Sequence, residues 1–180
     1  MKTNIRLLIL AFCLTPLFYG CVDKKSKTES ETKITENLNI NDSIPVYDFE
    51  ALEPLLYTNS DKIHIVNFWA MWCAPCVKEL PIIKKYAASH PDVEVTLVSL
   101  DFPRGIETKL KPFLKDNAID LKVVLLDDPD SNTWIDKINS NWSGSIPFTI
   151  IFNNEKRSYH ERDFESIEDL ETEIQNTFNN

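Results

Sequence analysis

The sequence has little glycine, little histidine and no excess of positive charge. Its 180 residues include three glycines and three histidines, and 19 Lys and Arg stand against 28 Asp and Glu, a formal net charge of -9. Three scattered glycines provide no glycine-rich phosphate loop, which argues against a nucleotide, and we expect no cofactor. The negative charge argues against nucleic acid as a partner. The length suits one folded domain with a spare segment.

Cysteine is also scarce, and the four cysteines divide between two parts of the chain. Cys13 and Cys21 lie near the amino terminus, whereas Cys73 and Cys76 lie in the body of the sequence. The body therefore has no further cysteine for a structural disulfide framework. Its single possible internal bridge joins Cys73 to Cys76, which is typical of a redox site.

Residues 1–20 have the parts of an export signal. Lys2 and Arg6 precede an apolar run at 7–14, and a small residue, Gly20, closes the segment. The alternative is a membrane anchor, but a spanning helix needs about 20 apolar residues. This run stops early, and its less strictly apolar continuation to Tyr19 contains Pro16. We therefore predict an export signal.

Cys21 follows Gly20 in an arrangement that resembles a bacterial lipoprotein signal, in which the cysteine is acylated. Cleavage nearby by ordinary signal peptidase and an uncleaved anchor remain alternatives. The next residues are polar and charged, so we expect a flexible tether over residues 21–43. A folded domain is expected over residues 44–180.

Within this domain, β-branched apolar runs alternate with segments of helical periodicity. Strands are predicted at residues 63–68, 93–100, 121–126, 148–152 and 156–161. Helices are predicted at 75–89, 106–117, a short stretch around Trp134 capped by Ser131 or Asn132, and 166–178. Pro81 is expected to kink the first of these. The alternation favours a three-layer α/β domain with parallel strands and a terminal hairpin.

The segment 66–81, with Trp72-Cys73-Ala74-Pro75-Cys76 at its centre, closely resembles the TlpA/ResA-like branch of the thioredoxin superfamily. The resemblance extends over residues 45–178 in element order, and residues 104–126 match the helix–strand insertion of that branch. It implies a thioredoxin-like α/β fold with a central mixed sheet flanked by helices. It also implies a thiol–disulfide oxidoreductase with a redox-active Cys73–Cys76 disulfide.

The spacing of the two cysteines has a direct physical use. Cysteines three residues apart at the start of a helix can close a disulfide with little backbone movement. Free N–H groups and the positive end of the helix dipole stabilise a thiolate at Cys73 and lower its pKa. We expect Cys73 to attack a partner disulfide and Cys76 to resolve the mixed disulfide, while Pro75 stiffens the loop.

Two other uses of paired cysteines fit poorly. A zinc site usually needs four ligands, and the remaining candidates, His64, His90 and His160, are not paired at a ligand spacing. Haem attachment requires histidine after the second cysteine, where this sequence has Val77. We therefore expect no metal.

Ile146 and Pro147 form the second part of the predicted site. The resemblance implies a cis peptide bond before Pro147, lying against the cysteines and presenting backbone to an extended substrate. The alternative is an ordinary proline at the start of a strand.

The sequence departs from its relatives at acidic positions. Asn67 stands where many thioredoxins have a buried acid, and Ala74 stands where some relatives have an acid between the cysteines. Glu79 is therefore a candidate to deprotonate Cys76; a solvated helix position or a packing role is the alternative. Asp101 is a weaker candidate, and Trp72 is assigned a shielding and packing role.

These observations predict an exported, membrane-tethered enzyme on the periplasmic side of a bacterial membrane. The resemblance implies that the enzyme reduces protein disulfides, for example in cytochrome c maturation, and that an upstream dithiol donor reduces its cysteine pair again. A copper-handling protein of the Sco type is the alternative, although that type needs CxxxC and a distal histidine. A peroxidase and a purely structural disulfide module are further alternatives.

Overall fold

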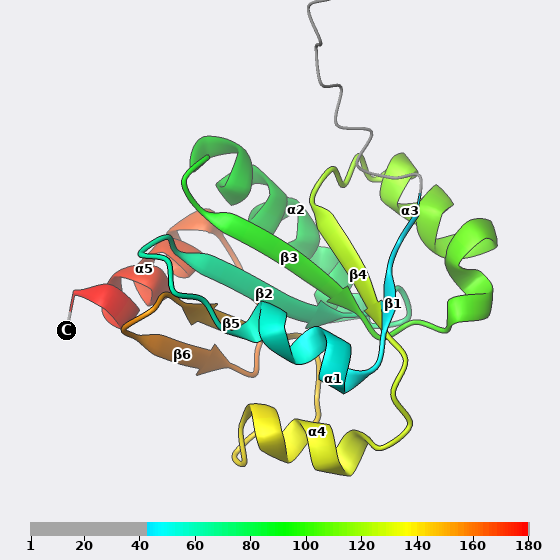
Figure 1. Ribbon diagram of the computed structural model, residues 1–180. Helices are drawn as coiled ribbons and strands as arrows, with labels where there is room; N and C mark the ends of the chain where they lie inside the picture. Colours follow the sequence, from blue (N-terminus) through cyan, green and yellow to red (C-terminus); the bar gives the residue numbers. More distant parts are fainter. Residues whose placement is uncertain (1–42, 180) are drawn as a thin grey trace, which may run out of the picture. The chain divides into compact units, whose positions relative to one another are not determined.

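The computed structural model describes residues 43–179, in which six strands form one mixed sheet (Figure 1). The strands are β1 (Val46–Tyr47), β2 (His64–Trp69), β3 (Glu94–Ser99), β4 (Lys122–Leu126), β5 (Phe148–Phe152) and β6 (Arg157–His160). Their order is β1-β4-β3-β2-β5-β6. The first four are mutually parallel, and β5 and β6 add an antiparallel hairpin next to β2. The predicted mixed sheet with a terminal hairpin is confirmed.

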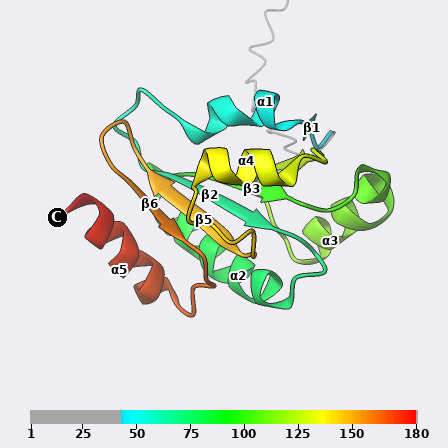
Figure 2. The same ribbon diagram turned by 90° about the horizontal axis from the view of Figure 1, so that it is seen from below.

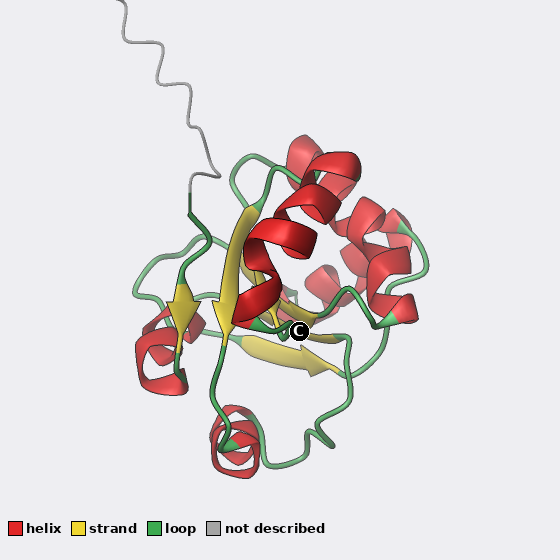
Figure 3. Ribbon diagram, turned by 90° about the vertical axis from the view of Figure 1, so that its right-hand side faces the viewer, coloured by secondary structure: helices red, strands yellow, loops and turns green. Residues whose placement is uncertain are grey.

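Helical segments lie between the strands and after the last one. They are α1 (Phe49–Leu52), α2 (Ala74–Ser89), α3 (Lys111–Asp116), α4 (Ser131–Ile138) and α5 (Ile167–Phe178), with 3-10 turns at Glu53–Leu56 and Pro103–Gly105 and a π-helical turn at Ile106–Leu110. Figure 3 shows these helices on both sides of the sheet.

The alternation of side chains along β2 separates two hydrophobic cores. Ile65 faces one core, to which α2, α3 and α5 contribute, and Val66 faces the other, to which α1 and α4 contribute. Figure 2 shows this separation, with α1 and α4 above the sheet and the other three helices below. The domain therefore has three layers, as predicted.

Several boundaries differ from the sequence prediction. The helix expected over 106–117 is a π-helical turn followed by α3, and Pro112, which has no N–H to donate, lies in the first turn of α3. The predicted cap at Ser131 or Asn132 is wrong, because α4 begins at Ser131 and Asp130 is its N-cap residue. Helix α2 continues through Pro81. Strand β1 and helix α1 were not predicted; each is only a few residues long, too short for a clear periodicity.

The predicted export signal over residues 1–20 and the predicted lipid-bearing Cys21 lie outside the described residues. Nearly all of the predicted tether lies there as well. In the described part of the chain, every helix is too short or too polar to span a lipid bilayer.

Candidate active site

Cys73 and Cys76 lie where the loop after β2 enters α2, and they are joined by a disulfide bond. Their Cα atoms are 5.3 Å apart, within the range that a disulfide permits. Cys73 is the N-cap residue of α2 with an extended backbone, and Pro75 occupies the first turn, where its missing N–H costs nothing. The predicted pairing is thus present in the structure.

The Cys73 sulfur lies at the positive end of a 16-residue helix. The backbone N–H of Cys76 points to Cys73 Sγ at 3.3 Å, a donor that would also stabilise a thiolate. Cys73 is 7% exposed, whereas Cys76 is completely buried. Of the two residues, only Cys73 has surface that another molecule can reach.

The segment before β5 closes the site from the other side. The Ile146–Pro147 peptide bond is cis, as predicted, and the Ile146 carbonyl oxygen lies 3.5 Å from Cys73 Sγ. The indole N–H of Trp142 donates to the Ser145 carbonyl at 2.8 Å, and the Glu161 carboxylate accepts the Ser145 N–H at 3.2 Å. These contacts fix the backbone that faces the cysteine.

Glu79 is completely buried, so the interpretation of it as a residue on a solvated helix face is wrong. It lies one helical turn beyond Cys76 on α2, and the helix turns this part of its surface toward the sheet. Its carboxylate accepts the amide of Asn67 at 2.8 Å and the backbone N–H of Phe164 at 2.9 Å. Asn67 in turn contacts the hydroxyl of Thr149 at 2.9 Å.

Burial raises the pKa of Glu79 to about 7, because a buried carboxylate loses the hydration that stabilises its charge. The N–H groups of Phe164 and Asn67 act in the opposite direction by donating to the carboxylate. A carboxyl group that titrates near neutral pH, one helical turn from Cys76, is suited to exchange a proton with that thiol.

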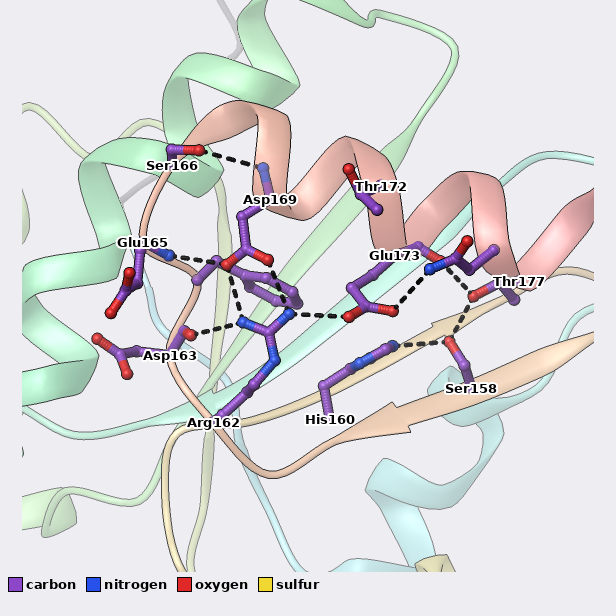
Figure 4. Close-up of polar contacts among 12 residues, drawn as sticks. Ser158, His160, Arg162, Asp163, Glu165, Ser166, Asp169, Thr172, Glu173 and Thr177 are labelled. Carbon is purple, nitrogen blue, oxygen red and sulfur yellow. Dashed lines mark hydrogen bonds and ion pairs between the residues drawn. The ribbon is translucent and has the colours of Figure 1, made fainter.

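Arg162 holds the loop that supplies the Phe164 N–H to Glu79 (Figure 4). Its guanidinium donates to both carboxylate oxygens of Asp169 at 2.8 Å and to Glu173 at 2.9 Å. Asp169 also accepts the backbone N–H of Glu165 at 3.0 Å. The segment between β6 and α5 is thereby tied to the first turns of α5.

We expect Arg162→Gln to lower the free energy of unfolding by about 1 kcal/mol at pH 7. This value allows for the partial exposure of Arg162 and of its partners Asp169 and Glu173. The guanidinium lowers the pKa of Asp169 and of Glu173 by hydrogen bonding to their ionised forms. Their contribution is therefore present above the ordinary pKa values of 3.8 and 4.5 and is lost as the pH falls through the lowered values.

Urea denaturation at pH 7 and pH 3 measures this difference. A matched control is Lys78→Gln, which removes the exposed pair with Asp163 at 3.4 Å and should cost less than about 0.5 kcal/mol. An Arg162→Gln effect equally large at both pH values would contradict the ionic origin of the contribution.

Asp101 holds the loop before Cys73 in position and makes no hydrogen bond to the sulfur atoms. Its buried carboxylate accepts the backbone N–H of Met71 at 3.1 Å and the hydroxyl of Ser99 at 2.9 Å. It therefore connects the loop before Cys73 to the end of β3. Trp69 is buried in the core, whereas Trp72 is 65% exposed. The packing role predicted for Trp72 is therefore wrong, and its shielding role remains a prediction.

Sequence reasoning missed the residues that support Glu79 and those that hold the Ile146 backbone. Arg162, Phe164 and Glu161 come from the β6–α5 region, far along the chain from the cysteines. The sequence carries no local signal for them, since polar residues near a predicted hairpin are common on any surface. Among residues 43–179, no three His, Cys, Asp or Glu side chains gather as a metal site would require.

Comparison with known proteins agrees with this geometry. The model of the AhpC/TSA family matches residues 48–157. Sporulation thiol-disulfide oxidoreductase A of Bacillus subtilis is 31% identical over 75 residues, 41% of this chain and 46% of the relative. Thiol-disulfide oxidoreductase ResA of Bacillus cereus is 28% identical over 93 residues, 50% of this chain and 53% of the relative. The chain spans about half the length of these curated relatives.

A solved thioredoxin-related protein from Neisseria meningitidis serogroup B has a similar fold. The TM-score is 0.52 at 25% sequence identity, and the match covers 63% of this chain and 83% of that one. The thioredoxin-like fold and the resemblance to ResA-type proteins are therefore confirmed.

Proposed function

The chain belongs to the AhpC/TSA family, and from this premise we propose that it is a thiol–disulfide oxidoreductase that reduces protein disulfides. One observation carries the proposal. The Cys73 sulfur lies at the start of α2 with a backbone N–H pointing to it, and a second sulfur lies within bonding distance. The helix position favours a Cys73 thiolate as the nucleophile. The second sulfur can then displace the bound substrate from Cys73 by forming the Cys73–Cys76 disulfide.

The exchange begins from the reduced pair. The Cys73 thiolate attacks one sulfur of the substrate disulfide, so that a Cys73–substrate bond forms and the other substrate sulfur leaves and takes up a proton. Cys76 then loses its proton and attacks Cys73 Sγ, which expels the second substrate sulfur as a thiolate that also takes up a proton. Two electrons and two protons have passed to the substrate, and a dithiol donor regenerates the pair.

The chain's own groups assist specific steps. Glu79, with its pKa raised by burial to about 7, accepts the proton that Cys76 must lose. The Ile146 carbonyl oxygen, 3.5 Å from Cys73 Sγ, marks a backbone edge along which an extended substrate segment can pair. Substrate would therefore approach between Cys73 and the segment before Pro147.

We further propose that the domain works outside the cytoplasm, on the periplasmic side of a membrane. The support is the sequence pattern of residues 1–20 and the Gly20-Cys21 junction, with an acyl group on Cys21 as the anchor. The substrate class is protein disulfides, with apocytochrome c as the member that the family resemblance suggests.

The test is reduction of insulin disulfides with dithiothreitol as donor, using the whole chain. The wild-type chain is expected to accelerate insulin reduction, and the Cys73→Ser/Cys76→Ser variant is not. Activity of both proteins at the uncatalysed rate, or rapid consumption of hydrogen peroxide in place of insulin reduction, would overturn the proposal. Membrane fractionation of wild type and Cys21→Ser tests the anchor separately.

A further inference from the structure

A cavity of about 690 Å³ opens directly beside the redox loop. One wall is formed by Met71 and Trp72, and the other comes from residues 101–109, after β3. Trp72 immediately precedes Cys73 in the chain, so their Cα atoms are only about 3.8 Å apart. The wall of the cavity therefore begins one residue from the reactive cysteine. A molecule bonded to the Cys73 sulfur needs only a few residues of its own chain to enter it.

The walls expose two large aromatic side chains. Trp72 is 65% exposed and Phe102 is 63% exposed, and both line this cavity. Aromatic side chains left in water beside a hollow are typical of surfaces that bind another molecule, because covering them removes apolar area from water. The cavity therefore favours an apolar or aromatic side chain.

The charge at the cavity is positive, although the chain as a whole carries a net charge of -9. Arg104 and Lys109 line it, and within residues 43–179 neither forms an ion pair. The Arg104 guanidinium lies 5.2 Å from the centre of the Phe102 ring. The one acid of the lining, Asp101, is buried and engaged by Met71 and Ser99.

Hydrogen bonds from two backbone N–H groups hold the two walls of the cavity together. The Leu100 N–H donates to the Trp69 carbonyl at 2.8 Å, and the Met71 N–H donates to the Asp101 carboxylate. These contacts hold the segment after β3 against the segment that leads into Cys73. A ligand in the cavity would therefore be positioned relative to the sulfur.

We propose that this cavity binds the segment of the protein substrate next to its reactive cysteine, and that it selects an apolar residue accompanied by acidic residues. This inference rests on the exchange reaction proposed above and names the substrate class of that same site. The apolar residue covers Trp72 and Phe102, and the carboxylates pair with Arg104 and Lys109.

The probes are two ten-residue peptides whose single cysteine is joined to 5-thio-2-nitrobenzoate. One carries Leu-Asp-Glu beside the cysteine and the other carries Leu-Lys-Lys. Release of the coloured thiolate by the reduced whole chain reports each rate. The rate of each protein variant with a peptide is divided by the rate of the same variant with 2-hydroxyethyl disulfide, a small neutral disulfide, which corrects for its general activity. The rate is also divided by the rate at which glutathione reacts with the same peptide, which corrects for the peptide's own reactivity.

We expect the acidic peptide to react about tenfold faster than the basic one, the size of effect that two exposed charge pairs supply. Arg104→Glu/Lys109→Glu should abolish or reverse this preference. The matched control is Lys85→Glu/Lys122→Glu, which makes the same change in charge away from the cavity. Lys85 lies on α2, twelve residues beyond Cys73, and Lys122 begins β4 at the opposite end of the sheet. This control variant should retain the preference.

Equal rates for both peptides, or an unchanged preference in Arg104→Glu/Lys109→Glu, would overturn the inference. Loss of the preference in the control variant as well would also overturn it, since net charge alone would then explain the selectivity. Failure of the wild-type chain with 2-hydroxyethyl disulfide is a different result, because it contradicts the exchange reaction itself.

Discussion

The Cys76→Ser variant is expected to accumulate a covalent mixed disulfide with its substrate, whereas Cys73→Ser should lose exchange activity by about a thousandfold or more. The difference follows from the position of the two sulfur atoms. Cys73 is the N-cap residue of α2 and retains 7% of its surface, while Cys76 is completely buried in the core and is bonded to Cys73. Without Cys76 the first step proceeds, and no second thiol is present to release the substrate.

Non-reducing electrophoresis followed by mass spectrometry measures the trapped species after incubation with insulin. The Cys73→Ser variant is the matched control, because it contains one thiol of the same pair in the same fold. Trapping through Cys76 in that control would reverse the assignment of nucleophile and resolving thiol. No adduct in Cys76→Ser would contradict a mixed disulfide through Cys73.

The Glu79→Gln variant is expected to be more stable than the wild type at pH 8 by up to about 3 kcal/mol, and equally stable near pH 4. Burial raises the folded-state pKa of Glu79 from 4.5 to about 7. The protonated acid therefore contributes stability that is fully present below pH 4.5 and is lost as the pH rises through about 7. A glutamine never ionises and avoids this loss.

Glutamine can preserve the local hydrogen bonds. Its carbonyl oxygen can accept the Phe164 N–H, and its amide can donate to Asn67 once that side chain turns over, since Asn67 Oδ1 has no partner in the described part of the chain. Turning the Asn67 amide over also changes its contact with the Thr149 hydroxyl, so the pH dependence of the stability difference reports the charge of residue 79. Urea denaturation between pH 4 and pH 8 is the measurement, with the exposed Glu155→Gln as control. A stability difference independent of pH would contradict the raised pKa.

The same variant should slow exchange despite its added stability. Without a group to take the proton from Cys76, resolution of the mixed disulfide is expected to slow about 100-fold at pH 7.5. The pH profile of the resolution step should also lose its inflection near pH 7. An unchanged profile in Glu79→Gln would assign that inflection to another group.

The sequence predicted the parts of this fold that rest on local patterns. The strand at 148–152 was placed without error, and α2 differs by one residue, because long apolar runs and the cysteine motif mark both clearly. Strand β1 and helix α1 escaped prediction because a few residues form no recognisable period. The redox pair and the cis bond before Pro147 followed from the motif and the order of elements.

The environment of Glu79 could not be predicted in the same way. Its burial depends on which face of α2 meets the sheet and on the arrival of Phe164 from a segment 85 residues away. The positive cavity is similar, because the segment after β3 meets Trp72 only in the folded protein. Such sites arise from tertiary packing, for which the separate stretches carry no periodic signal.

Alkylation of the reduced chain by iodoacetamide across pH 5 to 10, with mass spectrometry to locate the label, tests the role of Cys73 most directly. Cys73 should be labelled first, with a midpoint at least one pH unit below the value of about 8.5 for free cysteine, while Cys76 stays unlabelled. Labelling of Cys76 first, or no labelling of either thiol at neutral pH, would contradict a thiolate held at the start of α2.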